Sequence, residues 1–126
     1  MIDIKKAKEE FKNYVQNYDP NDEKVKLKIA HIKRTSLVAK NTAKYLKLSE
    51  EDILLAELIG LLHDIGRFEQ IKRYHTFVDK ISVNHGEFGV KILFDDGLIT
   101  KFIEDRKYDE IIKKAILNHN RGKIEE

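Results

Sequence analysis

The sequence predicts an all-α domain, a compact bundle of five or six helices. Apolar residues recur at helical spacing along most of the chain. With one proline, six glycines and few runs of β-branched residues, the chain lacks the turn signals every roughly 8 to 12 residues that a sandwich or barrel needs. Its 126 residues, 41% hydrophobic and 37% charged, fit one folded domain over residues 1–126.

Apolar spacing predicts the first two helices. Residues 3–17 form an amphipathic helix, which the turn-forming segment Asn17–Asn21 ends. A long helix follows from about Asp22 to Leu46. One stripe of this helix is expected to face inward although it carries polar groups. It comprises Leu27, Ala30, His31, Arg34, Leu37, Val38, Asn41, Thr42 and Tyr45.

The third helix is the most hydrophobic one. Ser49 and Asp52 have the spacing of a capping box, and a nearly unbroken apolar run continues from Ile53 to Ile65. A helix that is apolar on all sides is a central, buried one. Gly66 is expected to end it, and residues 67–80 are interpreted as short helical turns or loop.

Two further helices complete the bundle. Residues 84–94 have helical spacing and are stopped by Asp95-Asp96-Gly97. Residues 107–118 form the last predicted helix. The chain contains no internal repeat and no low-complexity linker, which agrees with a single domain.

The composition excludes several kinds of chemistry. Without cysteine there is no disulfide, thiolate metal site or cysteine nucleophile, so any metal must bind His, Asp or Glu. The glycines are scattered and form no phosphate loop, and no serine lies in a nucleophile elbow. The charged start MIDIKKAKEEF and the lack of a stretch of about 20 apolar residues predict a cytoplasmic protein without a membrane span.

Charge is unevenly distributed along the chain. Residues 1–48 carry a net charge of +6 and residues 49–126 a net charge of −4, for a total of +2. A basic half can attract polyanions, but these lysines are interspersed with acids and no array of stacking aromatics accompanies them. The pattern argues against nucleic acid as a partner.

The histidines are the candidates for chemistry. His63 and Asp64 are adjacent at the end of the most hydrophobic helix, where burial is costly unless both groups have partners. A metal ion or a tight ion pair satisfies that requirement, and Gly66 permits a close approach of the backbone. Imidazole with carboxylate suits zinc, manganese or iron, whereas magnesium prefers more oxygen ligands.

Each histidine also has a structural interpretation. His31 can be a hydrogen-bonded core residue, His85 can lie in a surface turn, and His119 can cap a helix. His75 has no motif around it and is interpreted as structural. The placement of four histidines at the ends or inner faces of separate helices favours a shared site.

The ordered set of these residues resembles the HD-domain metal-dependent phosphohydrolases. The match consists of His31, then His63-Asp64 in LLHDIGRFEQ, then His85 in NHGEFG, and His119 in ILNHN, and it covers roughly residues 25–120. The resemblance implies a catalytic-type helical core that binds a divalent ion, namely Mn, Fe, Zn, Co or Mg. The implied metal ligands are His31, His63, Asp64, His85 and His119.

The resemblance also implies a reaction. A metal-activated water would cleave a phosphate ester, such as that of a nucleotide. His85 and His119 would bind a second metal or hold the phosphate. Arg67 is a candidate phosphate contact because its planar fork matches phosphate oxygens, the alternative being a solvated surface cation. Glu69 is a candidate for orienting the water, or else it points to solvent.

One departure from the family pattern concerns its last metal ligand. This ligand is an aspartate on a later helix, and no aspartate follows Asp109 here. We therefore expect a bundle that lacks the family's C-terminal Asp-bearing helix and binds metal weakly. The alternative function is a catalytically weak or inactive HD-like module that binds a nucleotide or a protein partner.

Overall fold

The fold was analysed in a computed structural model that describes residues 1–125, and the side chains of residues 1–119. Every regular element in this range is helical, as predicted: six α-helices have six residues or more, and one is a single turn. The helices are α1 (Ile4–Val15), α2 (Glu23–Tyr45), α3 (Glu50–Leu62), α4 (Gly66–Tyr74), α5 (His85–Val90), α6 (Ile99–Phe102) and α7 (Asp109–Glu125). The predicted domain boundary at residue 126 lies outside the described residues.

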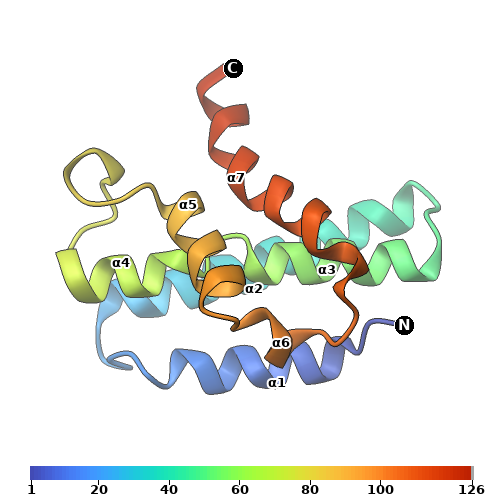
Figure 1. Ribbon diagram of the computed structural model, residues 1–126, viewed down its shortest axis with the longest axis horizontal. Helices are drawn as coiled ribbons and strands as arrows, with labels where there is room; N and C mark the ends of the chain where they lie inside the picture. Colours follow the sequence, from blue (N-terminus) through green and yellow to red (C-terminus); the bar gives the residue numbers. More distant parts are fainter. Residues whose placement is uncertain (126) are drawn as a thin grey trace.

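The helices form two groups around a shared core. α2 packs along α3, and α1 packs against α3 and α6. α5 packs between α4 and α7. In Figure 1, α5 and α7 lie above the row formed by α3 and α4, and α1 lies below that row. No helix in the described residues is long and apolar enough to cross a membrane.

Side-chain caps fix the starts of four helices. Asp3, Asp22, Ser49 and Asn84 each accept a hydrogen bond from a backbone N–H in the first turn of the helix that follows. Such a cap stabilises a helix by about 1 kcal/mol. The predictions for residues 3–17 and 22–46 are confirmed to within two residues, and the Ser49 side chain accepts from the Asp52 N–H as the capping box requires.

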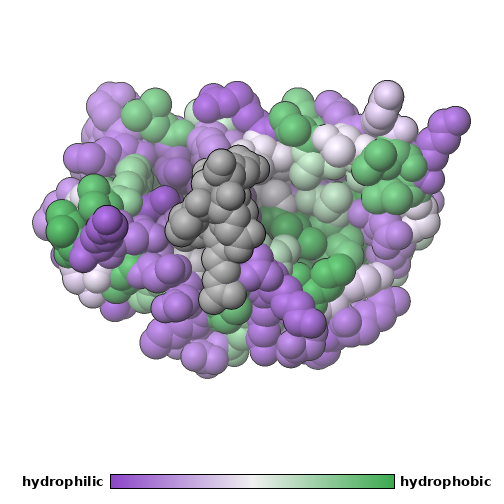
Figure 2. Space-filling model, turned by 90° about the horizontal axis from the view of Figure 1, so that it is seen from above, coloured by the Kyte–Doolittle hydropathy of each residue, from purple (hydrophilic) through white to green (hydrophobic). Residues whose placement is uncertain are grey.

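The predicted inner stripe of α2 is wrong. Leu27 is 67% exposed and Tyr45 is 85% exposed. Exposed hydrophobic residues are common on this protein, and Figure 2 shows several among the hydrophilic ones on one face. The buried face of α2 carries Val25, Ile32, Ser36 and Ala43. The reason is the close approach of α3: a Cβ on Gly60 would lie 2.7 Å from the Ser36 Cα. Small residues permit this contact. The predicted stripe was instead based mainly on the spacing of large apolar residues.

The segment after α3 also differs from the prediction. Gly66 begins α4 instead of ending α3, which stops at Leu62, and residues 63–65 form the turn between the two helices. α4 is a regular helix because Phe68 and Ile71 bury its inner face in the core. It ends at His75, whose φ of 59° is left-handed.

The last two predicted helices are present, with one shift in position. α5 continues into a π-helical turn, η2 (Lys91–Asp95), and Gly97 with φ +80° follows it, in agreement with the predicted stop. α7 is longer than predicted, so His119 lies within the helix instead of at its end. The pattern of large apolar residues stops before this last stretch, which explains the early predicted end.

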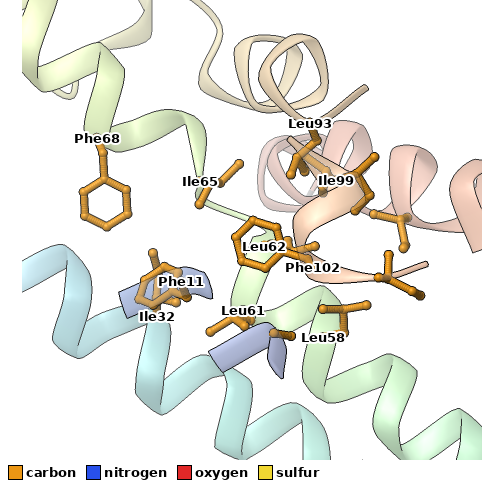
Figure 3. Packing of buried hydrophobic residues seen from close by; sticks show 14 of the residues in the cluster. Phe11, Ile32, Leu58, Leu61, Leu62, Ile65, Phe68, Leu93, Ile99 and Phe102 are labelled. Atoms are coloured by element: carbon orange, nitrogen blue, oxygen red, sulfur yellow. The ribbon is translucent and has the colours of Figure 1, made fainter. Parts of the chain in front are cut away.

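The core joins helices from both groups. Figure 3 shows side chains that converge from α1, α2, α3, the α3–α4 turn, α4 and α6. The labelled members include Phe11, Ile32, Leu62, Ile65, Phe68 and Phe102. Burial of each such side chain contributes about 1.5–3 kcal/mol. Because Leu62 and Ile65 are fully buried on either side of His63 and Asp64, the core fixes the position of that pair.

Candidate metal centre

The Asp64 carboxylate is the centre of the site. It is buried in the turn between α3 and α4, and four histidines point their Nε2 atoms at it. Oδ2 lies 3.5 Å from His31 and 3.3 Å from His63. Oδ1 lies 3.3 Å from His85 and 3.2 Å from His119. The carboxylate therefore separates the histidines into two pairs.

Each pair forms a group with the geometry of a metal site. The ligand atoms of His31, His63 and Asp64 lie within 4.8 Å of one another, and so do those of Asp64, His85 and His119. We call the first group the open subsite, because the His31 side chain is 40% exposed, and the second the buried subsite, because that of His85 is 3% exposed. The His31 and His63 ring centres are 5.7 Å apart, within reach of one ion.

Backbone carbonyls orient two of the rings. His63 Nδ1 lies 2.7 Å from the Gly60 carbonyl oxygen, and His119 Nδ1 contacts the Ile116 carbonyl oxygen. A carbonyl oxygen only accepts, so each Nδ1 donates its hydrogen. In the neutral imidazole the Nε2 atom then carries a lone pair, which faces Asp64.

Asp79 orients the ring of His85 in the same way, with Nδ1 as the hydrogen-bond donor. His85 Nδ1 lies 2.8 Å from Asp79 Oδ2. Burial raises the pKa of Asp79, but the contacts to His85 and Gln70 lower this pKa by more. Asp79 is therefore ionised and accepts the hydrogen bond from His85. Neutral His85 therefore also presents an unprotonated Nε2. That atom is 2.8 Å from the Nε2 of His119. Two lone pairs at this distance repel unless a proton or a metal ion lies between them.

The ionisation of the site favours a cation. Burial alone would raise the pKa of Asp64, but the imidazoles of His119, His63 and His85 lower it further when they carry a proton on Nε2, so this pKa lies well below its ordinary value. Oδ1 of Asp64 is buried and makes no hydrogen bond. Burial and the charge of Lys28 lower the pKa of His31, which keeps this ring in the neutral, metal-binding form. The residues present therefore fit a divalent ion.

A buried hydrogen-bond network holds Asp79 in place. Its Oδ1 accepts from Arg67 at 3.0 Å and from Gln70 at 2.9 Å, and Gln70 is fully buried. Arg67 also donates to the Phe77 carbonyl oxygen at 2.8 Å. A carboxylate behind a ligand histidine fixes its tautomer and raises its basicity. Sequence reasoning missed Asp79 and Gln70, because their contacts cross a loop that no motif marks.

Lys28 is another residue that the sequence analysis missed. Its Nζ lies 3.2 Å from Asp64 Oδ2, and its side chain is only 16% exposed. Lys28 precedes His31 by three residues, so both lie on one face of α2. That spacing is the signal that could have identified it. The ammonium group also lies 5.3 Å from the centre of the Phe77 ring.

The two residues predicted to act on phosphate and water have other contacts. Arg67 is paired with Asp79, as described above. Glu69 accepts a hydrogen bond from the Tyr18 hydroxyl at 2.8 Å and pairs with Arg73 at 2.6 Å. Their predicted roles stay predictions. His75 forms the left-handed end of α4.

Comparison with known proteins agrees with this geometry. The HD domain family matches residues 29–126. The chain therefore belongs to the HD-domain family, whose members are generally metal-dependent phosphohydrolases, and its His/Asp group is of the kind typical of HD-domain metal sites. No curated protein matches the chain significantly, and no solved structure does.

Proposed function

We propose that this protein hydrolyses a phosphate ester of a small molecule, such as a nucleotide, with divalent ions bound around Asp64. The observation that carries the proposal is the orientation of His63, His85 and His119. The acceptors at their Nδ1 atoms turn three Nε2 lone pairs toward one buried carboxylate. Such an all-acceptor cluster needs protons or metal ions between its atoms, and a divalent ion meets this need for several of them at once.

In this proposal the four histidines and Asp64 form two metal-binding groups that share the aspartate. His31 and His63 hold an ion with Asp64 Oδ2, and His85 and His119 hold an ion with Oδ1. Bound divalent ions lower the pKa of a coordinated water and polarise a phosphoryl oxygen. Four imidazoles with one carboxylate favour Mn, Fe, Co or Zn over Mg, which prefers oxygen ligands.

Arg67 and Glu69 remain the proposed contacts to phosphate and water. Arg67 holds Asp79, and through it His85, so substrate must share or replace that contact. Burial raises the pKa of Glu69, but Tyr18 and Arg73 lower it further, so the carboxylate is ionised and can accept a hydrogen bond from water. The His31 side of the site is the more exposed, and we propose that substrate enters there.

Metal content and turnover of the purified protein test the proposal. We expect bound divalent metal, measured by mass spectrometry, and hydrolysis of p-nitrophenyl phosphate and of nucleoside monophosphates. Asp64→Asn should lower both at least about 100-fold, because it removes the carboxylate shared by both subsites. His75→Asn is the matched control, since asparagine tolerates its left-handed backbone, and should leave both unchanged.

Two results would change the conclusion. A wild-type protein that binds no divalent metal and has no activity contradicts the proposal. Metal and nucleotide binding without turnover would instead support the alternative, an HD-like binding module.

A further inference from the structure

The two subsites around Asp64 differ in the charged groups beside them. Lys28 lies 3.2 Å from Oδ2, the carboxylate oxygen of the open subsite. Its side chain is 16% exposed, so water screens this ion pair less than it would a surface pair. The ammonium is the cation that balances Oδ2 when no metal is bound. A divalent ion at the open subsite must displace it.

The buried subsite has features that favour metal binding. Its oxygen, Oδ1, is buried and makes no hydrogen bond. Asp79 lies behind His85 at 2.8 Å, and a carboxylate in this position strengthens a ligand histidine. Lys28 contacts the other carboxylate oxygen. The buried subsite thus offers an oxygen that only imidazoles face, whereas the oxygen of the open subsite is already paired with an ammonium group.

Displacement of Lys28 is sterically possible but electrostatically opposed. Lysine has a flexible four-carbon stem, so its head can move while α2 stays in place. Lys28 and Arg67 both contact the Phe77 ring, at 5.3 Å and 5.5 Å from its centre, so the displaced ammonium stays in a region that already holds a guanidinium. Its departure is opposed because it gives up the 3.2 Å ion pair with Asp64.

We propose that Lys28 acts as an internal competitor for the metal ion of the open subsite, so that the two subsites fill in order. The buried subsite binds first and tightly. The open subsite binds second and more weakly, because its ion must displace the Lys28 ammonium from Asp64 Oδ2. This inference rests on the proposed function only in its premise that divalent ions bind around Asp64.

Calorimetric titration of the metal-free protein with Mn²⁺, without substrate, tests the order. We expect two steps in the wild type, of which His119→Gln weakens the tighter and His31→Gln removes the weaker. Lys28→Met keeps the length of the side chain but removes its charge. It should tighten the weaker step at least about tenfold, within the usual range of coupling between two sites, and change the tighter step little.

Two variants control for other effects. Lys28→Arg keeps the charge and should behave as the wild type. Lys24→Met removes an exposed charge one turn away on the same helix and should change neither step. The inference is overturned if Lys28→Met leaves the weaker step unchanged or tightens both steps equally, or if the wild type fills both subsites in one step. Because no turnover is measured, an inactive protein that shows the ordered steps contradicts only the proposed function.

Discussion

A Cβ atom on Gly66 would lie 2.5 Å from the carbonyl oxygen of His85. The first turn of α4 therefore touches the first turn of α5 backbone to backbone, and His85, a proposed metal ligand, lies at the contact. This approach brings His85, which follows Asp64 by 21 residues, to within 3.3 Å of its carboxylate. Glycine is required at position 66 because a side chain would not fit, and not because the backbone has a left-handed φ angle.

Gly66→Ala is expected to lower the free energy of unfolding by about 1–3 kcal/mol, because the overpacked contact must open. It should also weaken metal binding, since His85 moves with α5. Urea unfolding and metal titration measure the two effects. Gly89→Ala is the matched control on the opposite side of the contact, where an added Cβ meets nothing closer than 3.5 Å. A Gly66→Ala protein as stable as the wild type would contradict this account of the contact.

Asp79→Asn should weaken metal binding at the buried subsite by about 10–100-fold, the usual effect of losing a carboxylate behind a ligand histidine. The amide keeps the size of the side chain but lacks the charge that would make His85 a stronger metal ligand. Metal titration measures the change. Asp96→Asn removes an exposed carboxylate paired with Lys91 and should have no effect. If the two variants bind metal equally well, Asp79 does not support the site.

Much of the fold was predictable because it depends on local pattern. Local sequence determines the caps at Asp22 and Ser49 and the apolar run of α3, because each depends on residues that are close together in the chain. The exposed stripe of α2 and the helical start at Gly66 were mispredicted, because both depend on how closely two helices approach. The distance between two packed helices cannot be predicted from residues that are neighbours in the sequence.

The site was predictable to the same extent. The histidines and Asp64 are marked by their types and by the motifs around them. Asp79 and Lys28 reach the cluster through the folded loop and through α2, and neither lies in a motif. Asp79 and Lys28, which contact the cluster, were therefore missed, although the histidines and the aspartate that the structure brings together were identified as candidates.

Acid should destabilise the metal-free protein in two ranges of pH. The pKa of His31 is lowered from 6.5 in the folded state, so the unfolded chain binds more protons below about pH 6.5 and stability falls there as pH decreases. The pKa of Asp64 is lowered from 3.8, so a second loss follows below about pH 3.8. Thermal unfolding as a function of pH measures both.

Variants assign the two ranges to their groups. His31→Gln should flatten the loss below about pH 6.5, and Asp64→Asn the loss below about pH 3.8. The effect of His31 is the smaller, because its ring is partly exposed and water screens its charge. A wild-type stability that rises as pH falls from 7 to 5 would have the wrong sign for a lowered His31 pKa.

Glu57 is a buried charge within the most hydrophobic helix. It is 3% exposed in α3, and Lys8 of α1 lies 2.7 Å from its carboxylate. Lys8→Met leaves this carboxylate buried without its cation and should lower the free energy of unfolding by about 1–3 kcal/mol, which urea unfolding measures. Because the Lys8 side chain is half-exposed, we expect a smaller loss in the free energy of unfolding than for a fully buried ion pair.

Adding Glu57→Gln to Lys8→Met should restore part of the lost stability, because a neutral amide is cheaper to bury than an unpaired carboxylate. Lys6→Met is the control: Lys6 also extends from α1, but its partner Glu104 is 89% exposed, and the loss should stay within about 0.5 kcal/mol. Equal losses for Lys8→Met and Lys6→Met would show that the Glu57 pair contributes no more than a surface contact. A double variant less stable than Lys8→Met would show that Glu57 stabilises α3 without its lysine.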